Sequence, residues 1–100
     1  MDQNRFYSFL GLIQKSGNIV SGYNSCLYNI KEKGCRLIII AEDASDNTKD
    51  KFINICSAKN IPYAICGMKD RIGSSIGRSA KSVLGVKDEN MSRVVLNMLK

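Results

Sequence analysis

A chain of 100 residues and 11.1 kDa is long enough to bury a substantial apolar core, so we expect one domain over residues 1–100. Its hydrophobic share of 44% excludes intrinsic disorder. The longest apolar run, residues 37–41, is far shorter than the roughly 18 residues of a membrane span, so we expect a cytoplasmic protein. The formal net charge is +6, and the whole excess lies in residues 51–100, which hold nine Lys or Arg against three Asp or Glu. Such a charge is typical of a protein that binds a polyanion, and equally of a solvated lysine-rich surface.

The first half of the chain predicts two helices that alternate with two strands. Apolar residues follow helical spacing over residues 6–13, and Gly17 is suited to the C-terminal cap of that helix. Residues 18–20 then form a short strand candidate, and Ser21 stands where the N-cap of a second helix belongs. The unbroken apolar run of residues 37–40 predicts a strand that is buried on both faces of its sheet.

The second half continues the alternation. A third helix follows an acidic loop, takes its N-cap from Asp43, Ser45 or Asn47, and ends at Asn60. Two further strands are predicted with a short helix between them; the strands cover residues 63–66 and 82–86. A last helix opens at an acidic pair, and its inward side is predicted to carry Met91, Val94, Val95 and Met98.

This order of elements predicts a three-layer α/β/α sandwich that begins with a helix and holds a mixed, mostly parallel sheet of about four strands. Ligands of such folds gather at strand ends and helix N-termini. Three loops therefore become candidate binding segments, namely residues 20–24, 41–45 and 77–81.

Two of these loops carry side chains suited to nucleic acid. Gly22 lets a ligand approach the start of a helix closely, and Asn24 has the donors and the acceptor needed to read a base edge. In the last loop, Arg78 and Lys81 are suited to phosphate groups. Ordinary helix caps and surface cations give the same patterns, so each motif alone leaves that interpretation open.

Catalytic and metal-ligating residue types are sparse. The chain has no histidine, which removes the commonest general base and metal ligand. The pair Glu42 and Asp43 leaves open a magnesium-dependent phosphoryl-transfer or receiver-like domain, or a capping loop. We expect free thiols rather than a zinc site or disulfides, because no C-x-x-C pair occurs among Cys26, Cys35, Cys56 and Cys66. No catalytic residue, metal or cofactor is implied.

The motifs taken together resemble a known family. Their order and spacing are similar to those of the kink-turn RNA-binding ribosomal-protein superfamily, which includes the large-subunit proteins called L-seven-Ae and L-thirty-e, and above all to its small bacterial YlxQ-like branch. The segments that carry the resemblance are Lys15-Ser16-Gly17-x-x-Val20-Ser21-Gly22, residues 37–45, Asn60-Ile61-Pro62-Tyr63 and Ile72-Gly73-x-x-x-Gly77-Arg78.

The resemblance implies the same sandwich fold, RNA binding by the three loops and no catalysis. It implies a structured RNA as partner, with ribosomal RNA among the candidates, rather than DNA or a membrane, and we expect the chain to act as a monomer. The residues that it assigns to RNA are Lys15, Gly22, Tyr23, Asn24, Ser25, Glu42, Arg78 and Lys81.

Two positions depart from the family pattern Gly-x-Asn-Glu-x-x-Lys. Ser25 replaces the glutamate, and a hydroxyl cannot accept from two guanine N–H groups as a carboxylate does. Tyr28 replaces the lysine, and a neutral ring removes one phosphate contact. These two departures keep an alternative open, in which the chain is a protein-interaction module of the same fold that has lost tight kink-turn binding.

Overall fold

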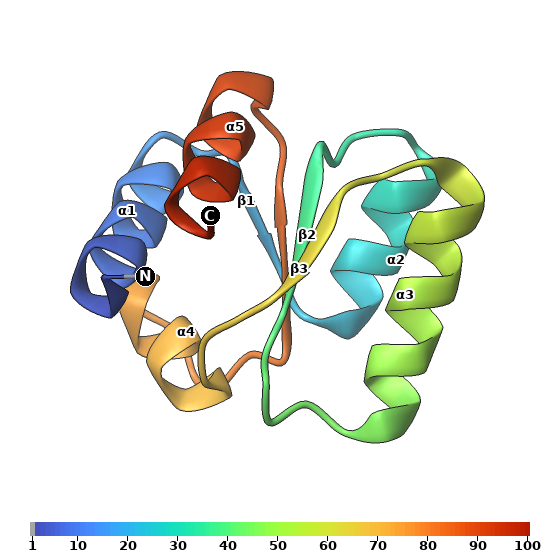
Figure 1. The fold of residues 1–100 in the computed structure, drawn as a ribbon, viewed down its shortest axis with the longest axis horizontal. Coiled ribbons are helices and arrows are strands. Elements are labelled where there is room, and N and C mark those ends of the chain that lie inside the picture. Colours follow the sequence, from blue (N-terminus) through green and yellow to red (C-terminus); the bar gives the residue numbers. More distant parts are fainter. Residues whose placement is uncertain (1) are drawn as a thin grey trace.

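The computed structural model describes residues 2–100 (Figure 1). Its elements in chain order are α1 (Gln3–Lys15), β1 (Ile19–Ser21), α2 (Tyr23–Lys31), β2 (Leu37–Ile40), α3 (Asp46–Lys59), β3 (Tyr63–Ile65), α4 (Lys69–Ser75), β4 (Val83–Val86) and α5 (Glu89–Met98). The sheet lies between a layer formed by α1, α4 and α5 and a layer formed by α2 and α3 (Figure 1). The predicted helix-first α/β/α sandwich is confirmed.

Strand β4 is the last of the four strands in the sequence, yet it lies inside the sheet, since the strand order is β1-β4-β2-β3. It pairs antiparallel with both β1 and β2, whereas β2 and β3 pair in parallel. Strands β1, β2 and β3 point the same way, as the predicted mixed and mostly parallel sheet requires, but the insertion of β4 makes two of the three pairings antiparallel. The carboxyl ends of β1, β2 and β3 therefore meet the start of β4 at one edge, the lower one in Figure 1.

The apolar core lies on both faces of the two central strands. All residues of β2 and β4 are buried, as the unbroken run at 37–40 predicts. Phe6 and Leu10 of α1 and Phe52 of α3 are fully buried as well, because the two helical layers cover opposite faces of the sheet.

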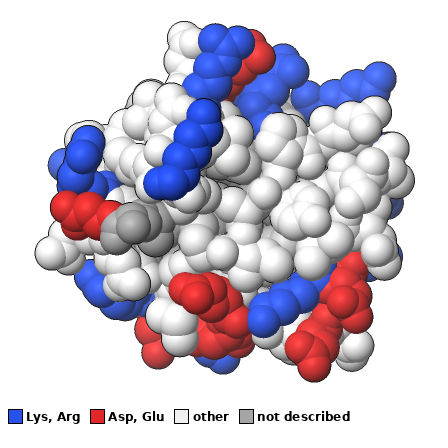
Figure 2. All heavy atoms as spheres, viewed as in Figure 1, with Lys and Arg blue, Asp and Glu red and all other residues white. Residues whose placement is uncertain are grey.

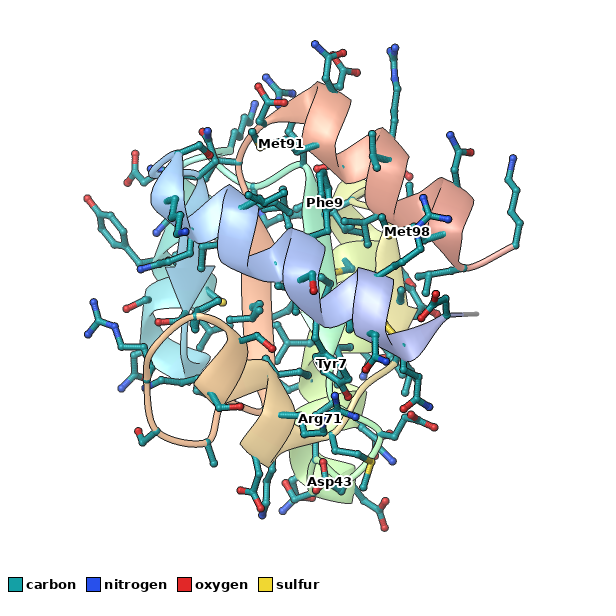
Figure 3. All side chains as sticks on the ribbon, turned by 90° about the vertical axis from the view of Figure 1, so that its left-hand side faces the viewer. Tyr7, Phe9, Asp43, Arg71, Met91 and Met98 are labelled. Atoms are coloured by element: carbon teal, nitrogen blue, oxygen red, sulfur yellow. The ribbon has the colours of Figure 1, made fainter. Side chains whose placement is uncertain are left out.

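Helix α5 buries less of its apolar side than the sequence predicts. Val95 is fully buried, but Val94 is 41% exposed, so the prediction that Val94 points inward is wrong. Met91 and Met98 are half-buried and lie along the junction between α5 and α1, with Phe9 between them (Figure 3). The helix packs on α1 and on the inner strand β4, and the side that it buries is narrower than the sequence pattern predicts.

Two of the predicted helix caps are confirmed and one is wrong. The hydroxyl of Ser45 accepts a hydrogen bond from the Thr48 N–H at 3.2 Å at the start of α3, and Asn60 ends that helix in the left-handed conformation with φ 57°. For α2, however, the N-cap is Gly22 rather than Ser21, because Ser21 is the last residue of β1.

Candidate nucleic-acid interface

The three candidate loops are held together by backbone hydrogen bonds at the carboxyl ends of the strands. The N–H of Gly22 donates to the carbonyl of Val83 at 3.0 Å, and the N–H of Ala41 donates to the carbonyl of Ser82 at 2.8 Å. The first and second loops are thus both bonded to the segment that enters β4. We call this region the three-loop edge, defined by residues 20–24, 41–45 and 77–81.

The first loop presents an open helix N-terminus. Gly22 has φ 97° and ψ 162°, and no described side chain caps the first turn of α2 behind it. No described atom lies within 4 Å of the position of a Cβ at Gly22, so a ligand has room to approach the first N–H groups of the helix. Asn24 and Ser25 are exposed in that turn.

Tyr23 combines packing with exposure. Its ring meets the buried ring of Phe52 edge-on at a centroid distance of 5.2 Å, which fixes the start of α2 against α3. The residue is nevertheless 41% exposed, so part of its ring faces solvent at the three-loop edge.

The second loop uses its acidic pair for two different purposes. Glu42 is exposed, and its backbone N–H donates to the carbonyl of Gly67 at 2.8 Å. A carboxylate oxygen of Asp43 accepts from the N–H of Lys69 at 2.9 Å, so Asp43 holds the first turn of α4 instead of capping α3. Within residues 2–100, no three His, Cys, Asp or Glu side chains gather in a way that would hold a metal ion.

Helix α4 is anchored at the same edge by Tyr7 of α1. The hydroxyl of Tyr7 accepts from the N–H of Met68 at 3.0 Å, and the guanidinium of Arg71 lies 4.2 Å from the centre of the Tyr7 ring (Figure 3). Arg71 is an exposed cation that the sequence analysis missed, because its partner lies in a helix at the other end of the chain. No local pattern in the sequence could have identified it.

Gly73, which precedes the third loop, and Gly77, which opens it, act differently. Gly73 is buried, and a Cβ there would collide with the backbone carbonyl of Ser79, so the loop folds directly onto α4. Gly77 has φ +72° and open space around it, so it serves the turn and not the packing. The N–H of Arg78 donates to the carbonyl of Gly73 at 2.9 Å, and Arg78 is exposed beside half-buried Lys81.

Lys15 is the one candidate RNA-binding residue that lies apart from the others. It ends α1 and therefore precedes β1, whereas Gly22 follows the carboxyl end of that strand. The exposed Lys15 side chain lines a shallow groove between α1 and α4 together with Leu12 and Ser75. Six of the eight candidate residues thus lie in the three-loop edge, Ser25 directly follows its first loop, and Lys15 lies outside it.

All four cysteines are buried free thiols, as the sequence predicts. Burial raises the pKa of Cys35, Cys56 and Cys66 to about 11. It also raises the pKa of Cys26 far above its ordinary value, with the neighbouring thiols of Cys35 and Cys56 adding to the effect. Such thiols are poor nucleophiles at neutral pH, because the reactive species is the thiolate.

None of the helices formed by residues 2–100 is long and apolar enough to cross a membrane. This finding agrees with the short apolar runs in the sequence.

Comparison with known proteins gives consistent results. A family model described as "Ribosomal protein L7Ae/L30e/S12e/Gadd45 family" matches residues 4–96. Two curated relatives are called "RNA-binding protein YlxQ": that of Bacillus subtilis (strain 168) is 28% identical over 99% of both chains, and that of Enterococcus faecium is 22% identical over 99% of this chain and 95% of its own.

Two solved structures share the fold. A Bacillus halodurans protein described as having unknown function superposes with a TM-score of 0.90 at 28% identity, covering 94% of this chain and 95% of that one. The "Giardia lamblia 15.5kD RNA binding protein" superposes with a TM-score of 0.77 at 23% identity, covering 93% of this chain and 80% of that one.

Proposed function

Because the chain belongs to the ribosomal protein L7Ae/L30e/S12e/Gadd45 family, we propose that it is a non-catalytic RNA-binding protein that contacts RNA through its three-loop edge. Relatives that carry the name RNA-binding protein YlxQ support the proposal. The structural observation that carries it is the start of α2, where Gly22 leaves the helix N-terminus open and uncapped by any described side chain.

Each residue of the edge has a distinct role in this proposal. The open N–H groups behind Gly22 attract a phosphate or a base acceptor, and Asn24 reads a base edge. Glu42, exposed on the neighbouring loop, accepts from a base amino group. Arg78 and Lys81 hold phosphates.

Three further residues complete the set. The exposed parts of Tyr23 and Ser25 border the bound RNA next to Asn24. Lys15, which lies outside the three-loop edge, reaches only the phosphates of RNA that continues past β1.

The partner is a structured RNA, and a kink-turn is the first shape to test. Ser25 and Tyr28 are both exposed on α2, and Tyr28 is 64% exposed, so both would face an RNA bound at the edge. Since neither can make the contacts of a glutamate or a lysine, kink-turn affinity should be moderate. We further propose a cytoplasmic monomer that acts on ribosomal or other structured RNA, without DNA as a target.

The test is equilibrium binding of fluorescently labelled folded RNAs, kink-turns included, at low and high salt. We expect binding that weakens steeply with salt, because each phosphate contact releases counterions. The edge variant Asn24→Ala with Arg78→Gln should bind at least tenfold more weakly than the parent. The control variant, Asn90→Ala with Lys51→Gln, makes the same change of charge at exposed positions elsewhere. If no folded RNA binds at low salt, the proposal is wrong.

A protein-interaction module is the second candidate, and one observation favours it. Tyr63 and Ile65 on the edge strand β3 and Met68 just after it are 38–44% exposed, which forms an apolar strip next to the three-loop edge. An RNA-free protein that still associates with a partner, and loses that partner when Ile65→Ser and Met68→Ser are introduced, would support this candidate instead.

A further inference from the structure

A groove of about 690 Å³ opens at the end of the molecule opposite the three-loop edge. It lies between α5 and the C-terminal ends of α2 and α3, above the points where β2 and β3 begin (Figure 1). We call it the basic groove and define it by its charged lining residues, Lys33, Arg36, Lys59, Glu89 and Arg93.

The charge around this groove is strongly positive. Four cations and one carboxylate line it, and that carboxylate, Glu89, already pairs with Arg93 at 3.4 Å. The lining therefore carries +3, half of the net charge of the chain. Figure 2 shows the same asymmetry: Lys and Arg side chains project along the upper end of the molecule, whereas most of the acidic side chains on that face gather toward the lower end.

Helix ends explain only two of these cations. Lys59 ends α3 and Lys33 lies just beyond the end of α2, and both positions favour a cation because a helix C-terminus is partly negative. Arg36 lies in the loop before β2, and Arg93 lies within α5, so neither compensates a helix C-terminus. Cations from three separate segments thus converge on one groove, and all four are exposed.

The floor of the groove is apolar but not aromatic. Its apolar lining includes Ile61, Pro62 and Leu96, and the described residues that line the groove contain no Phe, Tyr or Trp. Single-stranded bases are held mainly by stacking on aromatic rings, which this floor lacks. Exposed Lys and Arg above an aliphatic floor instead suit phosphates and sugars, which carry no sequence information.

We propose that the basic groove binds the phosphate backbone of a second RNA segment, so that one molecule holds RNA at both ends of its sheet. The inference rests on the proposed function, because RNA held at the three-loop edge supplies neighbouring phosphates at high local concentration. The protein measures only 31 × 27 × 25 Å, so an RNA stem that continues from the three-loop edge along the protein soon reaches the basic groove at the opposite end.

The test compares two RNAs and three proteins. The first RNA is a kink-turn with short stems, and the second is the same kink-turn with one stem extended along the protein. The groove variant carries Arg36→Gln and Lys59→Gln, and the control variant carries Lys51→Gln and Lys100→Gln; all four positions are exposed and the two variants lose equal charge.

We expect all three proteins to bind the short RNA within about twofold of one another. The extension should tighten binding to the parent and the control at least tenfold, and the groove variant should lose that gain. The salt slope for the extended RNA should fall by about 2 units in the groove variant, at about 0.9 for each lost phosphate contact. In amide NMR spectra, only the extended RNA should shift the signals of Lys33 and Arg93.

The possible outcomes separate this inference from the proposed function. If the short RNA binds and the extension adds nothing, the groove is not an RNA site, while the proposed function stands. An equal loss in the control variant would also overturn the inference. If neither RNA binds the parent, the inference is overturned, and the proposed function is overturned as well when no other folded RNA binds at low salt. If an oligoglutamate peptide shifts the groove amides at lower concentration than the extended RNA, the groove belongs to an acidic protein segment and the RNA assignment is wrong.

Discussion

A carboxylate oxygen of Asp43 accepts a hydrogen bond from the backbone N–H of Lys69 at 2.9 Å and so joins the loop after β2 to the first residue of α4. The N-cap position of α4 is Met68, whose thioether is a poor acceptor. Asp43 therefore supplies, from another segment, the acceptor and the negative charge that a helix N-terminus favours. The residue that the sequence offered as a magnesium ligand instead helps to hold the three-loop edge together.

We predict that Asp43→Ala lowers the free energy of unfolding by about 1 kcal/mol, the usual cost of losing a helix cap. Asp43→Asn keeps an acceptor and should cost less. Urea denaturation measures both. As a control, Asp50→Ala removes an exposed carboxylate from the middle of α3 and should change stability by less than about 0.5 kcal/mol. Equal effects at both positions would show that the bond to Lys69 contributes nothing.

We predict that Gly73→Ala costs about 1–3 kcal/mol, because the added Cβ meets the backbone of Ser79, which cannot yield as a flexible side chain would. Thermal or urea unfolding measures the loss. Ser74→Ala in the next position is exposed and serves as the control. A stable Gly73→Ala protein with an unchanged amide spectrum over residues 77–81 would contradict the close packing of loop on helix.

Substitution of Gly22 is expected to destabilise the protein through backbone strain alone. Its φ of 97° and ψ of 162° lie in a region that only glycine occupies readily, while the space around a Cβ is open. Gly22→Ala and Gly22→Ser should therefore destabilise the protein by similar amounts, about 1–3 kcal/mol, and should weaken RNA binding at the start of α2. A much larger loss for the bulkier serine would point to a steric clash that the structure does not contain.

We predict that Ser25→Glu combined with Tyr28→Lys raises the affinity for a standard kink-turn. The new carboxylate can accept from two guanine N–H groups, and one good bidentate contact is worth about 1–3 kcal/mol. The new lysine adds a phosphate contact and should steepen the salt slope by somewhat under one unit. Both positions are exposed, so the fold should tolerate the change.

The comparison uses a kink-turn and a plain duplex, with the same two charges placed on α5 by Asn90→Glu and Asn97→Lys as the matched control. A gain on both RNAs alike would mean that only charge had changed. No gain on the kink-turn, with the fold intact, would show that this face of α2 does not meet RNA.

The buried thiols predict a loss of stability at alkaline pH. The pKa values of Cys35, Cys56 and Cys66 rise from 9.0 to about 11 on folding, so the folded state holds these protons more tightly than the unfolded state. The thiol contribution to stability is therefore complete below pH 9 and is lost as the pH rises from about 9 to 11.

Urea midpoints measured from pH 7 to 11 check this expectation. The double variant Cys56→Ala with Cys66→Ala should be less stable throughout but should show a shallower alkaline fall than the parent. Because tyrosines and lysines titrate in both proteins, the difference between the two slopes isolates the thiols. Parallel slopes would contradict the predicted effect.

The sequence was sufficient for those features of the fold that depend on local patterns. The run at 37–40 predicted a fully buried strand, and Asn60 predicted the end of α3, because burial and capping leave signatures in neighbouring residues. The α/β/α layers followed from the alternation of such elements. The N-cap of α2 was misplaced by one residue, since Ser21 and Gly22 both suit a helix start and only the strand pairing of Ser21 decides between them.

Long-range contacts could not be predicted in the same way. The cation of Arg71 over the ring of Tyr7, and the bond from Lys69 to Asp43, join segments that no spacing rule connects. The basic groove likewise combines cations whose positions in the sequence suggest ordinary surface charge. For the candidate site, the sequence predicted eight RNA-contacting residues, and only the fold separates Lys15 from the others.

The central position of β4 sets a condition on synthesis by the ribosome. Among the strands formed by residues 2–100, β1 and β2 do not pair with each other, and each pairs with Val83–Val86 instead. While residues 83–86 are still inside the ribosome, the nascent chain can form helices and the parallel β2–β3 pair. Strand β1, which leads into the start of α2, still lacks its pairing partner β4. The three-loop edge therefore forms only after residues 83–86 have emerged from the ribosome, because the start of α2 is held in place through its bonds to that strand.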